Sequence, residues 1–136
     1  ELKSVVISAN VTTIENIAFW DCSKLTTVTF EKGSQLKTIG HNAYYECTSL
    51  TSIEIPASVE TIGNTAFSDC SSLATVTFEK GSRLKTIGNN AYYRCTSLTS
   101  IEIPASVETI EKKAFGTCIY NHRTTKTNQK YPSVNL

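Results

Sequence analysis

The stretch LTSIEIPASVETI occupies Leu50–Ile62 and recurs without a change at Leu98–Ile110. The copy is part of a longer repeat, because residues 25–72 align with residues 73–120 without a gap and match at roughly three quarters of the positions. Copying of this kind is expected when one structural unit stacks on another, since each unit must fit its neighbour. The sequence therefore predicts a repeat architecture.

A shorter repeat lies inside the long one. Ile, Ala, an aromatic residue and Cys recur in this order every 23 to 25 residues, and the cysteines of the series are Cys22, Cys47, Cys70, Cys95 and Cys118. This period is typical of leucine-rich repeats, in which each repeat is one coil of a solenoid. We therefore expect about five coils over residues 1–120. The polar tail over residues 121–136 is expected either to cap the last coil or to leave it open.

The pattern within each coil predicts its local structure. In LTSIEIP the apolar and polar residues alternate, which is typical of a short half-buried strand, and Pro56 closes it because proline cannot donate to a ladder. The segments AFSDC and AYYEC predict one short helical turn that directs Ala, the ring and Cys inward. Gly40, Gly63 and Gly88 predict turns, and EKGS in place of PAS predicts a surface loop in alternate coils. The predicted fold is a leucine-rich repeat solenoid of the α/β class, with short strands and short helical turns.

The string LTSIEIPASVETIGNTAFSDCSSL resembles the BspA-like leucine-rich repeats, also called the Treponema pallidum type, and the resemblance covers residues 2–120. It rests on the pattern A-F/Y-x-x-C-x-x-L-x-x-I-x-I-P, in which Cys precedes the strand and Pro follows it. The resemblance implies a curved solenoid on a cell surface or in a secreted protein. It also implies an adhesive or protein-binding role, with host proteins or extracellular matrix as ligands, and no catalysis.

The five cysteines allow two interpretations. They form either metal or disulfide sites, or a ladder of small side chains that fill the same interior position of each coil. Side chains that point the same way from stacked coils have poor disulfide geometry, and no C-x-x-C motif is present. The ladder is the favoured interpretation, so we expect no metal site and no cofactor.

Candidate catalytic residues are few. Only His41 and His122 are available for acid–base chemistry, and the sequence lacks the nucleophile, zinc-protease and phosphate-loop motifs. Glu54 and Glu102 lie two coils apart, or about 10 Å, which is near the spacing of an inverting glycosidase pair, but both are expected to be exposed. The sequence predicts no catalytic site and no enzyme. A net charge of +1 and the lack of a long apolar run favour neither nucleic acid nor membrane insertion.

The outward positions of the strands are the main candidate for ligand binding. In leucine-rich solenoids this face is the usual binding surface, and here it carries Ser4, Thr27, Thr29, Ser52, Glu54, Thr75, Thr77, Ser100 and Glu102. The alternative is that Ser and Thr are simply favourable residues for exposed strand positions. A small, polar, regular face suits a protein backbone or a glycan.

Two further columns come from the repeat. Trp20, Tyr45 and Tyr93 form a secondary aromatic patch if they point outward, or cover the next coil if they lie flat. On the opposite edge, charges alternate in sign from coil to coil and predict ion pairs, at Lys37, Glu60, Lys85 and Glu108.

The sequence thus predicts a non-catalytic protein-binding or adhesion module, with a protein or glycan ligand such as extracellular matrix. The alternative is a structural spacer, or a solenoid that assembles end to end into a homo-oligomer through coils that lack a cap.

Overall fold

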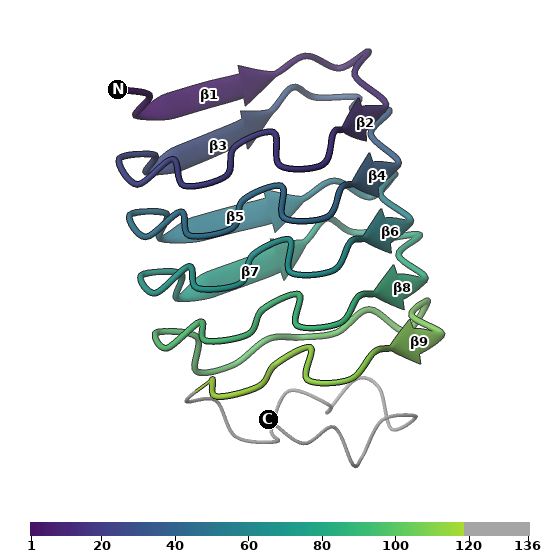
Figure 1. Cartoon of the computed structure of the whole chain (residues 1–136). Coiled ribbons are helices and arrows are strands. Elements are labelled where there is room, and N and C mark those ends of the chain that lie inside the picture. The colour runs from purple at the N-terminus through teal and green to yellow at the C-terminus, as the bar shows by residue number, and fades with distance from the viewer. Residues whose placement is uncertain (119–136) are drawn as a thin grey trace.

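A computed structural model describes residues 1–118 of the 136-residue chain. Five coils stack into a parallel β-solenoid (Figure 1). One side carries the four-residue strands β1 (Ser4–Ile7), β3 (Thr27–Phe30), β5 (Ser52–Ile55) and β7 (Thr75–Phe78). The other carries the two-residue strands β2 (Thr13–Ile14), β4 (Thr38–Ile39), β6 (Thr61–Ile62), β8 (Thr86–Ile87) and β9 (Thr109–Ile110). The predicted tail over 121–136 lies outside the described residues.

The two strand columns differ in continuity. The two-residue strands form one parallel sheet in the order β2-β4-β6-β8-β9, whereas the four-residue strands form two separate pairs, β1-β3 and β5-β7. Within each pair the register is regular, and Ser4 lies opposite Thr27 as Ser52 lies opposite Thr75. Each pair joins a short coil to the long coil that follows it. The long-to-short step from β3 to β5 has no ladder, so the sheet repeats every two coils.

The core consists of columns of identical positions. One column consists of Leu25, Leu50, Leu73 and Leu98, and another of Leu36, Val59, Leu84 and Val107, all of them fully buried. Beside them runs a stack of rings whose centroids lie 5.1, 5.2, 5.1 and 5.4 Å apart with interplanar angles of 9° or less, formed by Phe19, Tyr44, Phe67, Tyr92 and Phe115. Parallel stacking follows from the solenoid, because successive coils place each ring directly over the previous one.

The predicted helical turns are wrong for the residues that the structure describes, which contain no helix. In the AFSDC segment, Ser68 N–H donates to Thr65 O at 3.2 Å, while Phe67 and Asp69 N–H donate across to Ala91 and Tyr93 of the next coil at 2.7 Å each. An α-helix would require bonds to the fourth preceding residue. Here left-handed residues such as Thr65 and Asp69 (φ 55° and 61°) turn every second N–H toward the neighbouring coil.

Turns begin at Gly40, Gly63 and Gly88 as predicted, because their carbonyl groups accept hydrogen bonds from the N–H groups three residues later. The left-handed φ values among the glycines, however, belong to Gly33 and Gly81 in the EKGS loops (80° and 85°). At Gly63 the requirement is space, because an added Cβ would lie 2.8 Å from the carbonyl carbon of Gly40. Glycine at these positions therefore allows two coils to approach closely.

Candidate binding surface

The predicted strand-face residues all lie at the surface. Thr27, Thr29, Thr75 and Thr77 are exposed on β3 and β7, and Ser52 and Glu54 are exposed on β5. Ser4 and Val6 continue the two outward columns on β1, and Val6 is 63% exposed. Ser100 and Glu102 are also exposed, but they lie on a segment that forms no strand.

The break between β3 and β5 divides this face. A hollow of about 350 Å³ lies at the break, and its lining includes four of the predicted residues: Thr27, Thr29, Ser52 and Glu54. Glu31, Lys32 and Glu79 from the adjacent loops also line it. The hollow therefore combines hydroxyl groups with charged side chains. It lies where the ladder between β3 and β5 is missing, and the alternation of polar and apolar residues in the strands did not predict this break.

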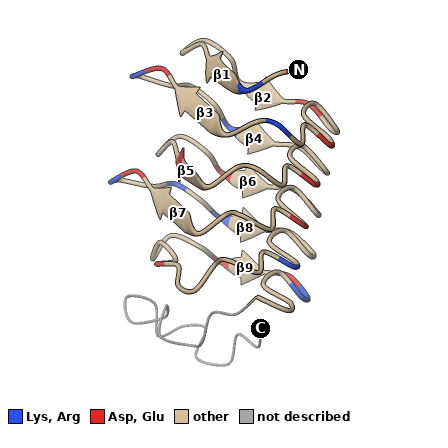
Figure 2. Cartoon of the chain, turned by 90° about the vertical axis from the view of Figure 1, so that its left-hand side faces the viewer, with Lys and Arg blue, Asp and Glu red and all other residues tan. Residues whose placement is uncertain are grey.

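The EKGS loops at residues 31–34 and 79–82 are fixed by their glutamates. The Ala9 N–H donates to Glu31 Oε1 and the Ala57 N–H donates to Glu79 Oε1, each at 2.8 Å. The charged loop tips follow β3 and β7 (Figure 2). The sequence predicted surface loops here, but not that each loop is bonded to the connection of the preceding coil.

The three predicted aromatic residues do not form one patch. Trp20 is 53% exposed and its ring lies 6.4 Å from that of Tyr45, which is half-buried. Tyr93 lies two coils further on, where it covers Gly116, and a Cβ at Gly116 would meet its ring at 2.7 Å. Arg94 stacks over Tyr93 at 5.5 Å from the ring centroid. The half-buried Tyr93 thus covers the coil below, and only Trp20 and Tyr45 are neighbours.

The alternating charge column forms two ion pairs. Lys37 Nζ lies 3.7 Å from Glu60 Oε2, and Lys85 Nζ lies 3.6 Å from Glu108 Oε2. This confirms the predicted pairing between neighbouring coils. These side chains are at least 40% exposed, so each pair contributes only about 0–1 kcal/mol.

The cysteines form the predicted interior ladder, and all five are free thiols. From the second coil onward, each S–H donates to the carbonyl of the stacked aromatic residue in the preceding coil. Examples are Cys70 Sγ to Tyr44 O at 3.1 Å and Cys47 Sγ to Phe19 O at 3.2 Å. Burial raises the pKa of the Cys47 thiol from 9.0 to about 12, despite its backbone hydrogen bond, and also raises that of Cys70. Such thiols are unreactive packing groups.

Residues 1–118 contain no cluster of three or more His, Cys, Asp or Glu side chains able to hold a metal ion. His41 is exposed, and its Nδ1 accepts a hydrogen bond from the Asn64 N–H at 2.8 Å. An asparagine has the same role one coil later, where Asn64 Oδ1 accepts a hydrogen bond from the Asn89 N–H. In this part of the chain, the structure also has no helix with the length and apolar character needed to cross a bilayer.

A family model for the BspA type leucine rich repeat region matches residues 1–125 in six copies. The chain belongs to this family. Leucine-rich repeats of this kind generally serve as interaction modules, often on surfaces. None of the curated proteins matches the chain.

Solved structures of this BspA-type family share the fold. The pneumococcal vaccine antigen PcpA is 34% identical, with a TM-score of 0.81 over 85% of this chain and 28% of its own. The T. pallidum leucine-rich repeat protein is 30% identical, with a TM-score of 0.79 over 86% of this chain and 55% of its own. A leucine-rich cell surface protein from Faecalibacterium prausnitzii is 29% identical, with a TM-score of 0.64 over 88% of this chain and 38% of its own. The chain therefore spans about a quarter to a half of these relatives.

Proposed function

We propose that this chain is a non-catalytic protein-binding or adhesion module of a cell-surface or secreted protein. The observation that carries the proposal is the hollow of about 350 Å³ on the strand face, lined by Thr27, Thr29, Ser52 and Glu54. Two relatives, one a vaccine antigen and the other a cell surface protein, support the proposed location. Host proteins and extracellular matrix are the expected ligands.

The test is binding of the purified chain to an immobilised panel of matrix proteins and glycans, beside the double variant Thr27→Arg/Thr75→Arg. Both threonines are exposed, so the variant should fold normally. Saturable binding that falls at least about tenfold in the variant supports the proposal, since tenfold equals 1.4 kcal/mol. Equal binding by a folded variant contradicts it.

A second function, self-assembly, is favoured by the apolar surface of the first coil. Among residues 1–118, every exposed large hydrophobic side chain lies there: Leu2, Val6, Ile17 and Trp20. Exposed apolar side chains on one coil are a surface that a second copy of the solenoid could cover. Light scattering should then show a mass that rises with concentration in the unmodified chain, and that stays monomeric in Ile17→Glu.

A further inference from the structure

The two EKGS loops, residues 31–34 and 79–82, belong to the second and fourth coils. Between them the third coil makes the shorter connection Pro56–Ser58. Two coil spacings separate the loops, which corresponds to about 10 Å. Figure 2 shows their charged tips on either side of the connection that follows β5. The alternation of long and short coils therefore produces two walls with a lower floor between them.

Two hollows lie between these walls. The first, of about 350 Å³, opens on the strand face and is lined by Glu31, Ser34, Glu54, Pro56 and Glu79, among others. The second, of about 460 Å³, lies beyond the floor and is lined by Ser34, Ala57, Ser58, Glu79 and Arg83, among others. Because Ser34 and Glu79 line both, the hollows adjoin across Pro56–Ser58. We call this continuous feature the trough.

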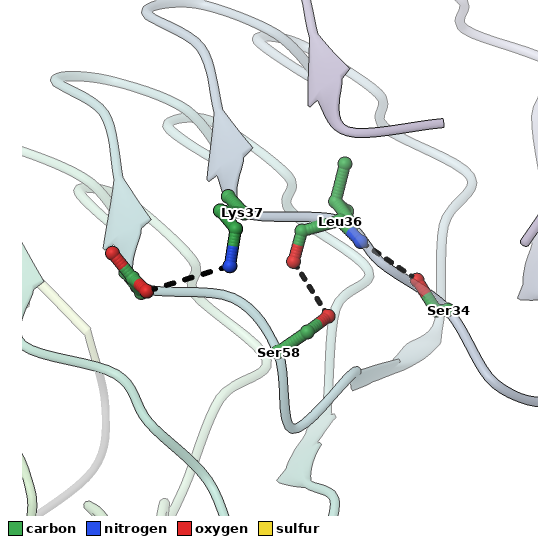
Figure 3. Close-up of polar contacts among 5 residues, drawn as sticks. Ser34, Leu36, Lys37 and Ser58 are labelled. Atoms are coloured by element: carbon green, nitrogen blue, oxygen red, sulfur yellow. Dashed lines mark hydrogen bonds and ion pairs between the residues drawn. The ribbon is translucent and has the colours of Figure 1, made fainter. Parts of the chain in front are cut away.

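The floor of the trough is held in place by hydrogen bonds to both walls. Ser58 Oγ donates to Leu36 O at 2.6 Å, and the Leu36 N–H donates to Ser34 Oγ at 3.2 Å (Figure 3). On the other side, the Ala57 N–H donates to Glu79 Oε1, and the Arg83 N–H donates to Ala57 O at 2.9 Å. A trough fixed in this way is preformed, so binding would cost little ordering of the protein.

The two ends of the trough differ in charge. At the strand end, Glu31, Glu54 and Glu79 outnumber Lys32. At the other end, Lys37 and Arg83 are present, and Glu79 is shared between the ends. Lys37 is paired with Glu60, so Arg83 is the cation available to a ligand at that end. The trough therefore offers opposite charges at its two ends.

We propose that the trough binds an extended polypeptide segment of a partner protein, with a basic side chain at the strand end and an acidic one at the Arg83 end. This specifies the proposed protein-binding function and rests on it. The width of about 10 Å equals the space that an extended strand and its side chains occupy between packed sheets. Among the described residues, the only aromatic ring that lines either hollow is the half-buried Phe30, so this part of the chain gives the trough no exposed platform on which sugar rings stack.

The internal repeat supplies a matched pair of variants. Ala57 lies in the floor of the trough within the sequence Pro-Ala-Ser, and Ala105 lies in the same sequence one double repeat later. Among the described residues, the hollow at Ala105 has only the 79–82 loop as a wall. Ala57→Trp therefore fills the trough, whereas Ala105→Trp makes the same chemical change outside it. Glu54→Lys, at an exposed strand position, changes the charge without adding bulk to the floor.

The experiment selects a phage-displayed library of random dodecapeptides on the purified chain and measures the binding of the selected peptides by fluorescence polarisation. We expect peptides that combine a basic and an acidic residue. Their affinity should fall at least about tenfold, or 1.4 kcal/mol, with Ala57→Trp and Glu54→Lys, and stay unchanged with Ala105→Trp. For Glu54→Lys with Arg83→Glu, selection should yield the opposite order of charges.

Three results would overturn the proposal. The first is that no peptide is enriched above an unrelated control protein, and the second is that the selected peptides bind folded Ala57→Trp as tightly as the unmodified chain. The third is that glycans, and not peptides, are the ligands whose binding Ala57→Trp abolishes. Thr75 is exposed on β7 but does not line the trough, so Thr75→Arg should leave peptide binding unchanged. If the unmodified chain binds nothing on the matrix panel, the proposed function is wrong. If Ala57→Trp keeps its peptides, the trough is wrong.

Discussion

At the scale of single residues, the hydroxyl groups of Tyr44 and Tyr92 are unusual, because both are buried without a hydrogen-bond partner. Burial raises the pKa of both phenols well above its ordinary value, with smaller contributions from nearby cysteines. Phe67 lies between them in the same ring stack and has no hydroxyl to satisfy. The stack itself therefore requires only the rings.

We predict that Tyr92→Phe raises the free energy of unfolding by about 1 kcal/mol, because an unsatisfied buried hydroxyl costs about 1–3 kcal/mol. Urea denaturation measures the change. Phe67→Tyr is the reverse control and should destabilise the fold by a similar amount. A loss of stability in Tyr92→Phe would show that the hydroxyl has a partner, such as a buried water.

His41 supplies a backbone acceptor at a single joint between coils. Its Nδ1 accepts the Asn64 N–H at 2.8 Å, as Asn64 Oδ1 accepts the Asn89 N–H one coil later. We predict that His41→Ala lowers the free energy of unfolding by about 1 kcal/mol, because the Asn64 N–H loses its acceptor, whereas His41→Asn keeps an amide acceptor and leaves the stability unchanged. Urea denaturation at neutral pH measures both changes, and equal losses in the two variants would contradict this.

At the scale of elements, the close approach of the coils depends on glycine. We predict that Gly63→Ala destabilises the fold by about 1–3 kcal/mol or more, because the new Cβ would lie 2.8 Å from the Gly40 and His41 backbones. Thermal unfolding by circular dichroism measures the loss. The control is Glu15→Ala, since Glu15 occupies the equivalent position in the first coil, is exposed and already carries a Cβ. A Gly63→Ala chain as stable as that control would show that neighbouring coils can separate freely.

The elements also show what alternation of residues can and cannot predict. The segment Ser52–Ile55 forms β5 and pairs with β7, yet the same four letters at Ser100–Ile103 form no strand. Since the sequences are identical, local propensity alone does not decide whether this segment forms a strand. The columns of inward Ile, Leu, ring and Cys were predictable because they depend only on the period. The trough was not, because it depends on which coils pair.

The same limit applies to the other candidate residues. Trp20, Tyr45 and Tyr93 share a position in the repeat, but the size of the next residue in the column decides how each ring lies. Similarly, AFSDC has the spacing of a helical turn, while bonds to the adjacent coil give it another backbone path. Sequence periodicity fixes which residues share a column, and contacts between coils fix the geometry within that column.

At the scale of the whole molecule, the ladder of buried thiols couples stability to alkaline pH. The folded state raises the pKa of Cys47 from 9.0 to about 12 and also raises that of Cys70, so it holds these protons more tightly than the unfolded chain does. Stability from the neutral thiols is therefore complete below about pH 9 and falls as the pH rises toward 12. Each thiol that ionises only on unfolding contributes a slope of about 1.4 kcal/mol per pH unit.

We predict that the urea midpoint of the unmodified chain falls steadily from pH 8 to pH 11. Because other side chains also contribute to the pH dependence of stability, the measurement compares slopes between variants. Cys70→Ala should be less stable at pH 8, because it leaves a cavity. Its stability should nevertheless fall less steeply with pH, because one buried thiol is gone. Parallel slopes for the two proteins would mean that the Cys70 thiol ionises as easily in the folded coil as in the unfolded chain, and the ladder would then contribute through packing alone.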